Sequence, residues 1–342
     1  MSLKATSSNP GATEQFHPGK RWLANLLLLA GSLALFAGLS EIGLRLFFAN
    51  DLRLIQDDRS LLYRYDKILG WFPIPGGSNR FAASRPIRVI NNSEGFRALE
   101  HTTNGRPGVL FLGDSFVWGY DVEAAERFTE KLQARHPEWN VYNLGVSGYG
   151  TDQEFLLLQL HYAAYKPRVV FLVYSTETDE DDNSTNARYG GYYKPYCTIL
   201  ENRLQIQGIP VPRSERVFLA EHTRLARSCL VRLLARAWFK LTAPPVLHNP
   251  SPTAALIRNL QQYVNSQGAL FLVGLTAPNP PLQEYLRHCD IPFVGLGTPL
   301  RYPGFGNHWT PEGHTFVCAK IDEFLAQGHY VVPERRRPVP LR

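Results

Sequence analysis

A serine follows directly on a buried apolar strand in this chain. Residues 108–113 are Gly-Val-Leu-Phe-Leu-Gly, and Asp114 and Ser115 come next. An apolar run closed by Gly-Asp-Ser is typical of a parallel strand whose carboxyl end opens into a helix, which is where ligands bind in such sheets. Free backbone N–H groups and the helix dipole would stabilise negative charge there, so Ser115 is a candidate nucleophile. The same tripeptide also suits an ordinary turn with Asp114 or Ser115 as N-cap.

A histidine near the C-terminus could serve as the base for this serine. His308 lies just before residues 311–326, whose apolar spacing predicts a helix with Thr310 as N-cap and Pro311 as its first residue. A loop histidine in that place can reach a serine at another strand end and accept its proton. A lone histidine is usually structural or superficial, but its pairing with Ser115 favours nucleophilic catalysis.

Alternating strand and helix patterns surround these two residues. They predict a parallel sheet with right-handed crossovers and helices on both faces, so that the carboxyl ends of the strands share one rim. Candidate site residues after successive strands would then meet at that rim. The expected strands are 108–112, 139–143, 168–174, 269–275 and 291–296, and the expected helices are 123–135, 152–164, 253–266 and 311–326.

The order of these motifs resembles the SGNH (GDSL-type) hydrolases, over residues 91–327. Gly113-Asp114-Ser115 resembles the nucleophile block, residues 143–151 resemble the second block, and His308 with Glu312-Gly313-His314 resembles the last. The resemblance implies a flavodoxin-like three-layer α/β/α SGNH hydrolase core with a parallel sheet. It also implies that Gly148 offers its backbone N–H to the oxyanion. No cofactor and no metal are expected for this chemistry.

The third block departs from the family pattern, which carries Gly-x-Asn-Asp after its strand. This chain has Thr176-Glu177-Thr178-Asp179. Thr178 takes the asparagine position if Asn183 keeps its usual place, whereas a shift of one residue would put Glu177 there. A threonine hydroxyl donates one hydrogen bond, and an amide donates two. Gly148, Thr178, Asp114 and Asn183 are therefore the candidate oxyanion and substrate-binding residues beside the catalytic pair.

The last block lacks the acid that orients the histidine. That acid is expected two or three residues before His308, where Gly306 and Phe305 stand. The resemblance then implies a Ser115–His308 dyad, with the imidazole oriented by a backbone carbonyl or by a residue from elsewhere. Losing the orienting acid can cost thousands-fold in rate. An esterase, an O-acyltransferase with an altered site and a catalytically degenerate binding protein all remain open, and the retained nucleophile and base favour an enzyme.

The N-terminal region has the length and composition of a membrane span. Residues 22–39 are uncharged and mostly apolar, residues 42–48 continue the run, and Lys20 and Arg21 precede it. About 20 apolar residues cross a bilayer, and flanking basic residues stay in the cytoplasm. We expect a single-pass signal-anchor in the inner membrane with the main domain in the periplasm. A cleaved signal peptide and a buried core helix are the alternatives.

These patterns predict five segments along the chain. They are a cytoplasmic N-terminus (1–21), one N-terminal transmembrane helix (22–48), a juxtamembrane segment (49–105), an SGNH hydrolase-like domain (106–330) with an insertion at 180–250, and a basic, proline-rich tail (331–342). In the juxtamembrane segment, Asn-Asn-Ser-Glu-Gly-Phe-Arg ends at Arg97. We expect Arg97 to have a structural role, with contact to an anionic substrate as the alternative.

The insertion carries several ambiguous features. Tyr189, Tyr192, Tyr193 and Tyr196 suit either stacking on sugar rings or a small hydrophobic subcore, and residues 179–182 suit a solvated acidic loop rather than a weak cation site. Basic residues and leucines alternate with helical spacing over 224–240, which predicts an amphipathic surface helix, with lipid contact as the alternative.

The four cysteines are widely spaced. Cys289 and Cys318 suit small buried hydrophobic positions, whereas Cys197 and Cys229 could form a disulfide within the insertion.

Composition restricts the remaining function classes. The chain has 342 residues, 44% of them hydrophobic and 19% charged, with a formal net charge of +6. No nucleotide-binding glycine motif, paired-cysteine metal motif or basic stretch interleaved with aromatics occurs, so no nucleic-acid partner is expected. We expect ester chemistry on an acylated carbohydrate or lipid of the cell envelope, and the competing hypothesis is a non-catalytic binding or assembly protein of an envelope polysaccharide system.

Overall fold

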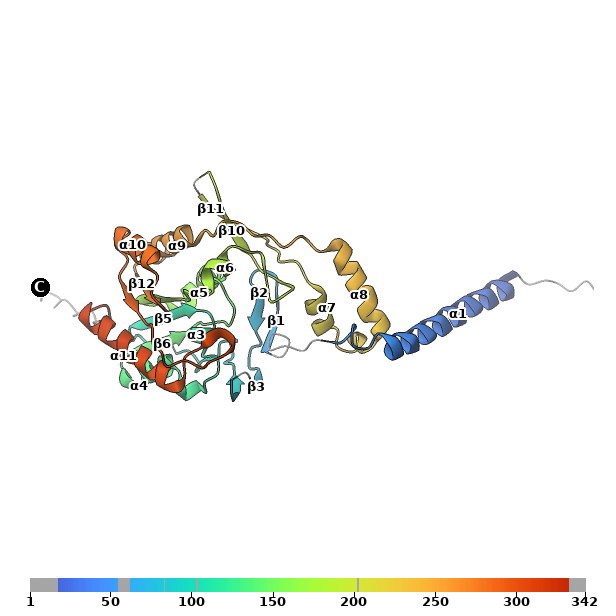
Figure 1. Cartoon of the computed structure of the whole chain (residues 1–342), viewed down its shortest axis with the longest axis horizontal. Coiled ribbons are helices and arrows are strands. Elements are labelled where there is room, and N and C mark those ends of the chain that lie inside the picture. Colours follow the sequence, from blue (N-terminus) through green and yellow to red (C-terminus); the bar gives the residue numbers. More distant parts are fainter. Residues whose placement is uncertain (1–17, 55–61, 83, 103, 202, 332–342) are drawn as a thin grey trace, which may run out of the picture. The chain divides into compact units, whose positions relative to one another are not determined.

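The computed structural model describes residues 18–54, 62–82, 84–102, 104–201 and 203–331 (Figure 1). The predicted tail from residue 332 and most of the predicted cytoplasmic segment lie outside these ranges. The described chain divides into two units. One contains residues 18–54 and 223–237, and the other contains the remaining residues. Each unit is described by itself.

The smaller unit contains α1 (Pro18–Phe47), the 3-10 turn η2 (Leu225–Arg227) and the start of α8 (Cys229–Thr242). Within α1, residues 21–47 have a mean hydropathy of 1.9 and are not buried inside the protein, so this helix is long and apolar enough to cross a membrane. The same properties fit a signal sequence near an N-terminus.

The larger unit is built on a five-stranded parallel sheet in the order β13-β12-β7-β5-β6. Its strands are β5 (Gly108–Gly113), β6 (Asn140–Asn143), β7 (Val169–Tyr174), β12 (Leu270–Leu275) and β13 (Phe293–Gly295). Every residue of β5 and β7 is buried because helices cover both faces of the sheet. The predicted three-layer α/β/α arrangement is confirmed.

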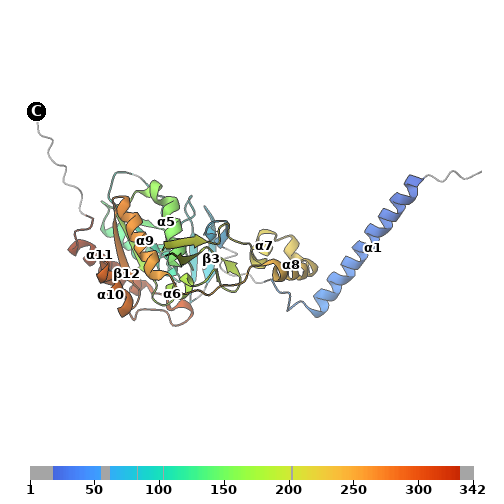
Figure 2. The same ribbon diagram turned by 90° about the horizontal axis from the view of Figure 1, so that it is seen from above.

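Side chains alternate between two cores along each central strand. On β5, Leu110 and Leu112 join the core beneath α5 (Thr151–Tyr165) and α9 (Thr253–Ser266), whereas Val109 and Phe111 join the core beneath α4 (Phe128–Arg135) and α11 (Pro311–Gln327). Figure 1 shows these helix pairs on opposite sides of the sheet, and Figure 2 shows α5 and α9 from above. Because both faces of the sheet are buried, a shift of one residue in any strand would misplace its side chains, so the register of each strand is fixed. The carboxyl ends of the strands therefore share one rim.

The observed core elements follow the predicted ones with a few differences. The helix expected over 123–135 is a 3-10 turn, η1 (Ala124–Glu126), followed by α4. The prediction also lacked α10 (Pro280–His288), although Asn279 caps it and two prolines occupy its first turn. At the end of the sheet, η3 (Phe305–Asn307) precedes α11, whose cap Thr310 and first residue Pro311 are as predicted.

Four antiparallel strand pairs and short helices complete the larger unit. Two pairs precede the sheet: β1 (Tyr63–Asp66) with β2 (Gly70–Pro73), and β3 (Ser78–Ala82) with β4 (Pro86–Ile90). The other elements are α3 (Ser115–Trp118), α6 (Asp179–Asn183), β8 (Ala187–Arg188), β9 (Tyr192–Tyr193), β10 (Tyr196–Leu200), β11 (Arg203–Gln207) and α7 (Glu215–Glu221). Within the insertion, Tyr193 packs with Ala187 and Val211, which agrees with the hydrophobic subcore.

All four cysteines are free. The disulfide considered for Cys197 and Cys229 is therefore not present. Cys197, Cys229 and Cys318 are buried, and burial raises the pKa of the Cys197 thiol to about 12, as expected of a small apolar residue rather than a reactive thiol.

Candidate active site

The structure brings Ser115 and His308 together at the rim of the sheet. His308 Nε2 lies 2.7 Å from Ser115 Oγ, although 193 residues separate the two in sequence. Ser115 follows β5, and His308 follows η3 and precedes α11. His308 is only 4% exposed. When Nδ1 carries the ring proton, Nε2 accepts the serine hydroxyl proton, which is the geometry of a nucleophile with its general base.

Asp114 shapes the turn that presents Ser115. Its carboxylate accepts a hydrogen bond from the Phe116 N–H at 2.9 Å and so caps α3. This helix is a single turn of four residues, so the helix dipole expected to help Ser115 is small, and individual N–H groups remain the available donors. Asp114 is buried, and burial raises the pKa of its carboxyl to about 6.

An acid that the sequence analysis did not identify faces the other nitrogen of His308. Asp121 Oδ2 lies 3.9 Å from His308 Nδ1, which exceeds hydrogen-bond length but is within ion-pair range. Asp121 is fully buried and accepts hydrogen bonds from the backbone N–H of Ser84 at 2.9 Å and from its hydroxyl at 2.8 Å. Asp121 is therefore the candidate for the residue from elsewhere that could orient the imidazole.

The turn that carries Asp121 has a left-handed backbone and a buried support. Asp121 has φ of +65°, which asparagine and aspartate adopt more readily than most residues. Arg97 donates to the carbonyls of Gly119 at 2.6 Å and Val122 at 2.7 Å, on either side of Asp121. Burial lowers the pKa of Arg97 to about 9. The structural role predicted for Arg97 is confirmed.

Gly306 explains why the acid is absent from its usual place. A Cβ built on Gly306 would lie 2.2 Å from His308 Cε1, so the imidazole occupies the space that any side chain at 306 would need. The ring also stacks on Tyr120, with centroids 4.2 Å apart. An aspartate at residue 306 would displace the imidazole from this position, whereas Asp121 faces the ring without that collision.

A cavity of about 280 Å³ is lined in part by Ser115 and His308. Thr178 lines it, but its hydroxyl donates to Ser175 Oγ at 2.9 Å and lies 3.5 Å from Asp114 Oδ2. The only hydrogen of the Thr178 hydroxyl is therefore already used. The lining residues are Asp114, Ser115, Phe116, Tyr120, Ser147, Thr178, Arg188, Tyr189, Gly306 and His308. Gly148 adjoins Ser147 with φ of +84°.

Arg188, on β8, is the one lysine or arginine among the described residues that line this cavity. Its Nε lies 2.7 Å from Asp182 Oδ1, and its guanidinium lies over the Tyr189 ring at 4.6 Å. Its Nη1 has no hydrogen-bond partner within the described part of the chain. No sequence signal indicated Arg188, because a single arginine in an insertion cannot be placed without the fold.

Asn183 does not line the cavity. Its amide nitrogen donates to Thr151 Oγ1 at 3.2 Å and Thr253 Oγ1 at 2.9 Å, so it joins α5, α6 and α9. The acidic run before it is not the solvated loop that was expected, since it forms α6 and buries Asp179 and Asp182. Burial raises the pKa of Asp182 to about 7 and that of Asp179 well above its usual value.

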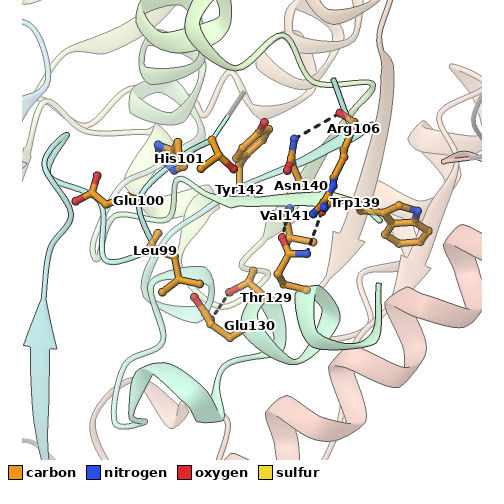
Figure 3. Close-up of a pocket in the computed structure, with 13 residues that line it drawn as sticks. Leu99, Glu100, His101, Arg106, Thr129, Glu130, Trp139, Asn140, Val141 and Tyr142 are labelled. Carbon is orange, nitrogen blue, oxygen red and sulfur yellow. Dashed lines mark hydrogen bonds between the residues drawn. The ribbon is translucent and has the colours of Figure 1, made fainter. Parts of the chain in front are cut away.

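A second cavity, of about 220 Å³, lies beside the edge strand β6 (Figure 3). Its wall includes His101, Arg106, Trp139 and Tyr142, and Figure 3 shows Asn140 directed toward Arg106. None of its lining residues lines the cavity over Ser115. No serine or cysteine is among its described lining residues, whereas Ser115 and His308 are in contact in the wall of the other cavity, which is therefore the candidate active site.

Comparison with known proteins gives matches among solved structures alone. No protein-family model and no curated protein matches this chain. A member of the lipolytic protein G-D-S-L family from Veillonella parvula DSM 2008 is 12% identical, with 64% of this chain and 98% of that chain covered and a TM-score of 0.39. A GDSL-like lipase from Bacteroides thetaiotaomicron VPI-5482 is 13% identical, covering 67% and 93%, with a TM-score of 0.35.

A two-domain esterase active on acetylated mannans is 14% identical, covering 69% of this chain and 53% of that chain, with a TM-score of 0.38. These identities and TM-scores indicate distant similarity. The chain itself has a five-stranded parallel sheet between helices, with Ser115 and His308 in contact at its rim.

Proposed function

We propose that this chain is a serine esterase or O-acyltransferase of the SGNH type, acting on ester-linked acyl groups of a carbohydrate or lipid in the cell envelope. The observation that carries the proposal is the 2.7 Å contact between Ser115 Oγ and His308 Nε2 in the wall of a cavity. A buried imidazole positioned on a serine at a strand end is suited to acyl transfer.

The first half of the reaction forms an acyl-enzyme. His308 Nε2 takes the proton of Ser115 Oγ while that oxygen attacks the acyl carbonyl carbon, giving a tetrahedral oxyanion and an imidazolium. The backbone N–H groups of Ser115 and Gly148 are the proposed donors to the oxyanion. The intermediate then collapses, the ester C–O bond breaks, and His308 gives its proton to the departing alcohol oxygen.

The second half releases the acyl group to an acceptor. Water or a sugar hydroxyl enters, loses its proton to His308 Nε2 and attacks the acyl carbonyl, and the proton returns to Ser115 Oγ as its bond to carbon breaks. Water as acceptor gives hydrolysis, and a sugar hydroxyl gives O-acyl transfer. The cavity wall includes Tyr120 and Tyr189, whose rings suit contact with a sugar face.

Asp121 is the proposed positioning residue in place of the usual acid. Its carboxylate faces His308 Nδ1, so it favours the tautomer with Nδ1 protonated and stabilises the imidazolium that forms during attack. Asp121 keeps two hydrogen bonds from Ser84, which fix the carboxylate in the buried turn.

Arg188 is the proposed third donor to the oxyanion. Thr178 commits its hydroxyl hydrogen to Ser175, whereas Arg188 lines the same cavity with an Nη1 that lacks a partner among the described residues. A guanidinium carries several donors on a long side chain, so it can replace the amide that the third block lacks.

The proposed location is the inner membrane, with α1 as a single-pass anchor and the catalytic domain in the periplasm. The apolar stretch 21–47 supports the anchor, and Lys20 with Arg21 supports the orientation. An anchored esterase of this orientation would meet acylated glycans or lipids of the envelope.

The second candidate function is a catalytically degenerate binding or assembly protein. The threonine at the asparagine position and the glycine at residue 306 favour it. The position of Asp121 beside His308 weighs against it, because a carboxylate facing Nδ1 supports Nε2 as a proton acceptor, which catalysis needs and binding does not.

Hydrolysis of p-nitrophenyl acetate and longer esters by the full chain in detergent tests the proposal, beside Ser115→Ala and His308→Ala. Both substitutions are expected to lower kcat by roughly a thousandfold or more, because the nucleophile and base act as one unit. Retained activity in either folded variant would contradict the proposed chemistry. If the wild type is also inactive on every ester, including with added sugar acceptors, the binding function is favoured.

A further inference from the structure

Helix α8 has an apolar face that the protein leaves exposed. Leu234, Trp238 and Leu241 are 60%, 64% and 85% exposed, and their spacing of four and three residues puts them on one side of the helix. Leu230, one turn before Leu234, continues the same face. Large exposed apolar side chains in a continuous row indicate a contact surface rather than a solvated one.

The same helix carries a basic row on another side. Arg232, Arg236 and Lys240 stand at intervals of four residues along the helix. The Arg232 guanidinium donates to the Ala226 carbonyl at 3.0 Å and to Cys229 Sγ at 2.7 Å, so the exposed basic row consists of Arg236 and Lys240. At about 100° per residue, this row lies roughly opposite Leu234 and Trp238. An apolar face with Trp and Leu combined with a basic face is the pattern of a helix that lies in a membrane surface.

A carboxylate of the apolar helix α1 caps the start of α8. Glu41 accepts hydrogen bonds from Ser228 Oγ at 2.7 Å, from Leu230 N at 2.9 Å and from Cys229 N at 3.0 Å. Arg45 Nε donates a hydrogen bond to Glu41 Oε1 at 2.6 Å, and Arg45 Nη2 donates one to the Arg227 carbonyl at 3.2 Å. The start of α8 is therefore fixed to α1, six residues before the end of the apolar stretch at Phe47.

We propose that α8 is an interfacial helix that lies in the membrane surface beside the point where α1 emerges, with Leu234, Trp238 and Leu241 in the acyl-chain boundary and the basic row toward anionic headgroups. The proposal rests on the proposed membrane anchorage. Six helical residues span about 9 Å, so the cap at Glu41 places the start of α8 within the depth of the bilayer interface.

The charges on α8 and on its cap favour lipid over a protein partner as the occupant of the apolar face. The basic row matches the anionic headgroups at a membrane surface, and basic side chains near such a surface each add to binding. The carboxylate of Glu41 satisfies the N–H groups at the start of α8, which would otherwise be costly at the edge of the apolar layer. A second protein seated on the apolar face is the alternative outcome of the test.

The experiment uses the full chain reconstituted in phosphatidylcholine–phosphatidylglycerol vesicles, with and without bromine on the acyl chains. Bromine quenches tryptophan that reaches the acyl-chain region. The variants are Trp238→Phe and, as a matched control, Trp139→Phe, whose half-buried ring stacks on His136 in the catalytic unit. We expect the Trp139→Phe protein to keep the quenched component of the wild type and the Trp238→Phe protein to lose part of it.

The outcomes separate the two proposals. Equal quenching of the wild type and Trp238→Phe, in protein that floats with the vesicles, would overturn the interfacial helix and leave the anchor intact. Protein that fails to float with vesicles would overturn the anchor and this inference together. Replacing phosphatidylglycerol by phosphatidylcholine should reduce the Trp238 component, and no change would contradict the role of the basic row.

Discussion

The two sides of the candidate site are built differently. The nucleophile side, residues 97–122, is a locally closed unit in which Arg97 holds the carbonyls around a turn that carries both Ser115 and Asp121. The facing side, residues 175–190, depends on the insertion, because Thr178 turns its hydroxyl to Ser175 and Arg188 comes from β8. Ser115 and the proposed positioning residue Asp121 therefore lie in one turn held by Arg97, whereas the proposed charge-stabilising residue Arg188 comes from the insertion.

The largest effect that would separate the two sides is expected at Asp121. Asp121→Asn should lower kcat by about a hundredfold to ten-thousandfold with little change in KM, because the tautomer and charge of His308 lose their support. Steady-state kinetics from pH 5 to 9 measure this. Asp121→Glu should recover part of the activity, and Glu123→Gln, which removes a nearby charge without contact to His308, should change kcat less than about twofold.

A loss of folding would make Asp121→Asn uninformative by itself. Asparagine keeps an acceptor for the Ser84 N–H, so the thermal midpoint should stay close to that of the wild type. Wild-type kcat in a folded Asp121→Asn protein would show that His308 is oriented by another group.

An intermediate effect is expected at Arg188, on the facing side. Arg188→Gln should lower kcat/KM by roughly a hundredfold, since removing one oxyanion donor has costs of that order. Thr178→Ala should lower it less than about threefold, because its hydroxyl hydrogen serves Ser175. Kinetics with one p-nitrophenyl ester compare the two variants. A larger loss of kcat/KM from Thr178→Ala than from Arg188→Gln would mean that Thr178, and not Arg188, is the oxyanion donor.

The smallest effect concerns stability beneath the facing side. Glu154, on α5, is fully buried, and its carboxylate oxygens have no hydrogen-bond partner among the described residues. Burial, with the nearby charges of Asp114 and Asp152, raises its pKa well above the usual value. The folded state therefore holds a proton that the unfolded state releases above about pH 4.3, so wild-type stability falls as pH rises.

Glu154→Gln should remove that dependence. The variant is expected to match the wild type near pH 4 and to exceed it at pH 7.5 by on the order of 1 kcal/mol in the free energy of unfolding. Denaturant unfolding at the two pH values measures this difference. A constant difference between the proteins at both values would mean that Glu154 is charged in the folded state.

The sheet could be predicted because its strands carry local patterns, and the contact between Ser115 and His308 could be predicted because both belong to motifs expected at one rim of that sheet. Buried runs such as residues 108–113 and caps such as Thr310-Pro311 need no long-range information. Asp121 could not be predicted, because its proposed positioning role depends on a left-handed turn and on a histidine far along the chain. Arg188 and Asn183 were placed by the fold of the insertion, whose short strands carry weak periodicity.

Covalent trapping shows whether Ser115 is a nucleophile that His308 activates. The full chain is treated with a fluorescent alkylphosphonate ester, which reacts with a serine oxygen activated by a base, and the modified peptide is identified by mass spectrometry. We predict a single adduct on Ser115 that forms at a much lower rate in Asp121→Asn and is absent in His308→Ala. An unmodified Ser115 in folded wild-type protein, or an adduct that forms equally fast without His308, would contradict it.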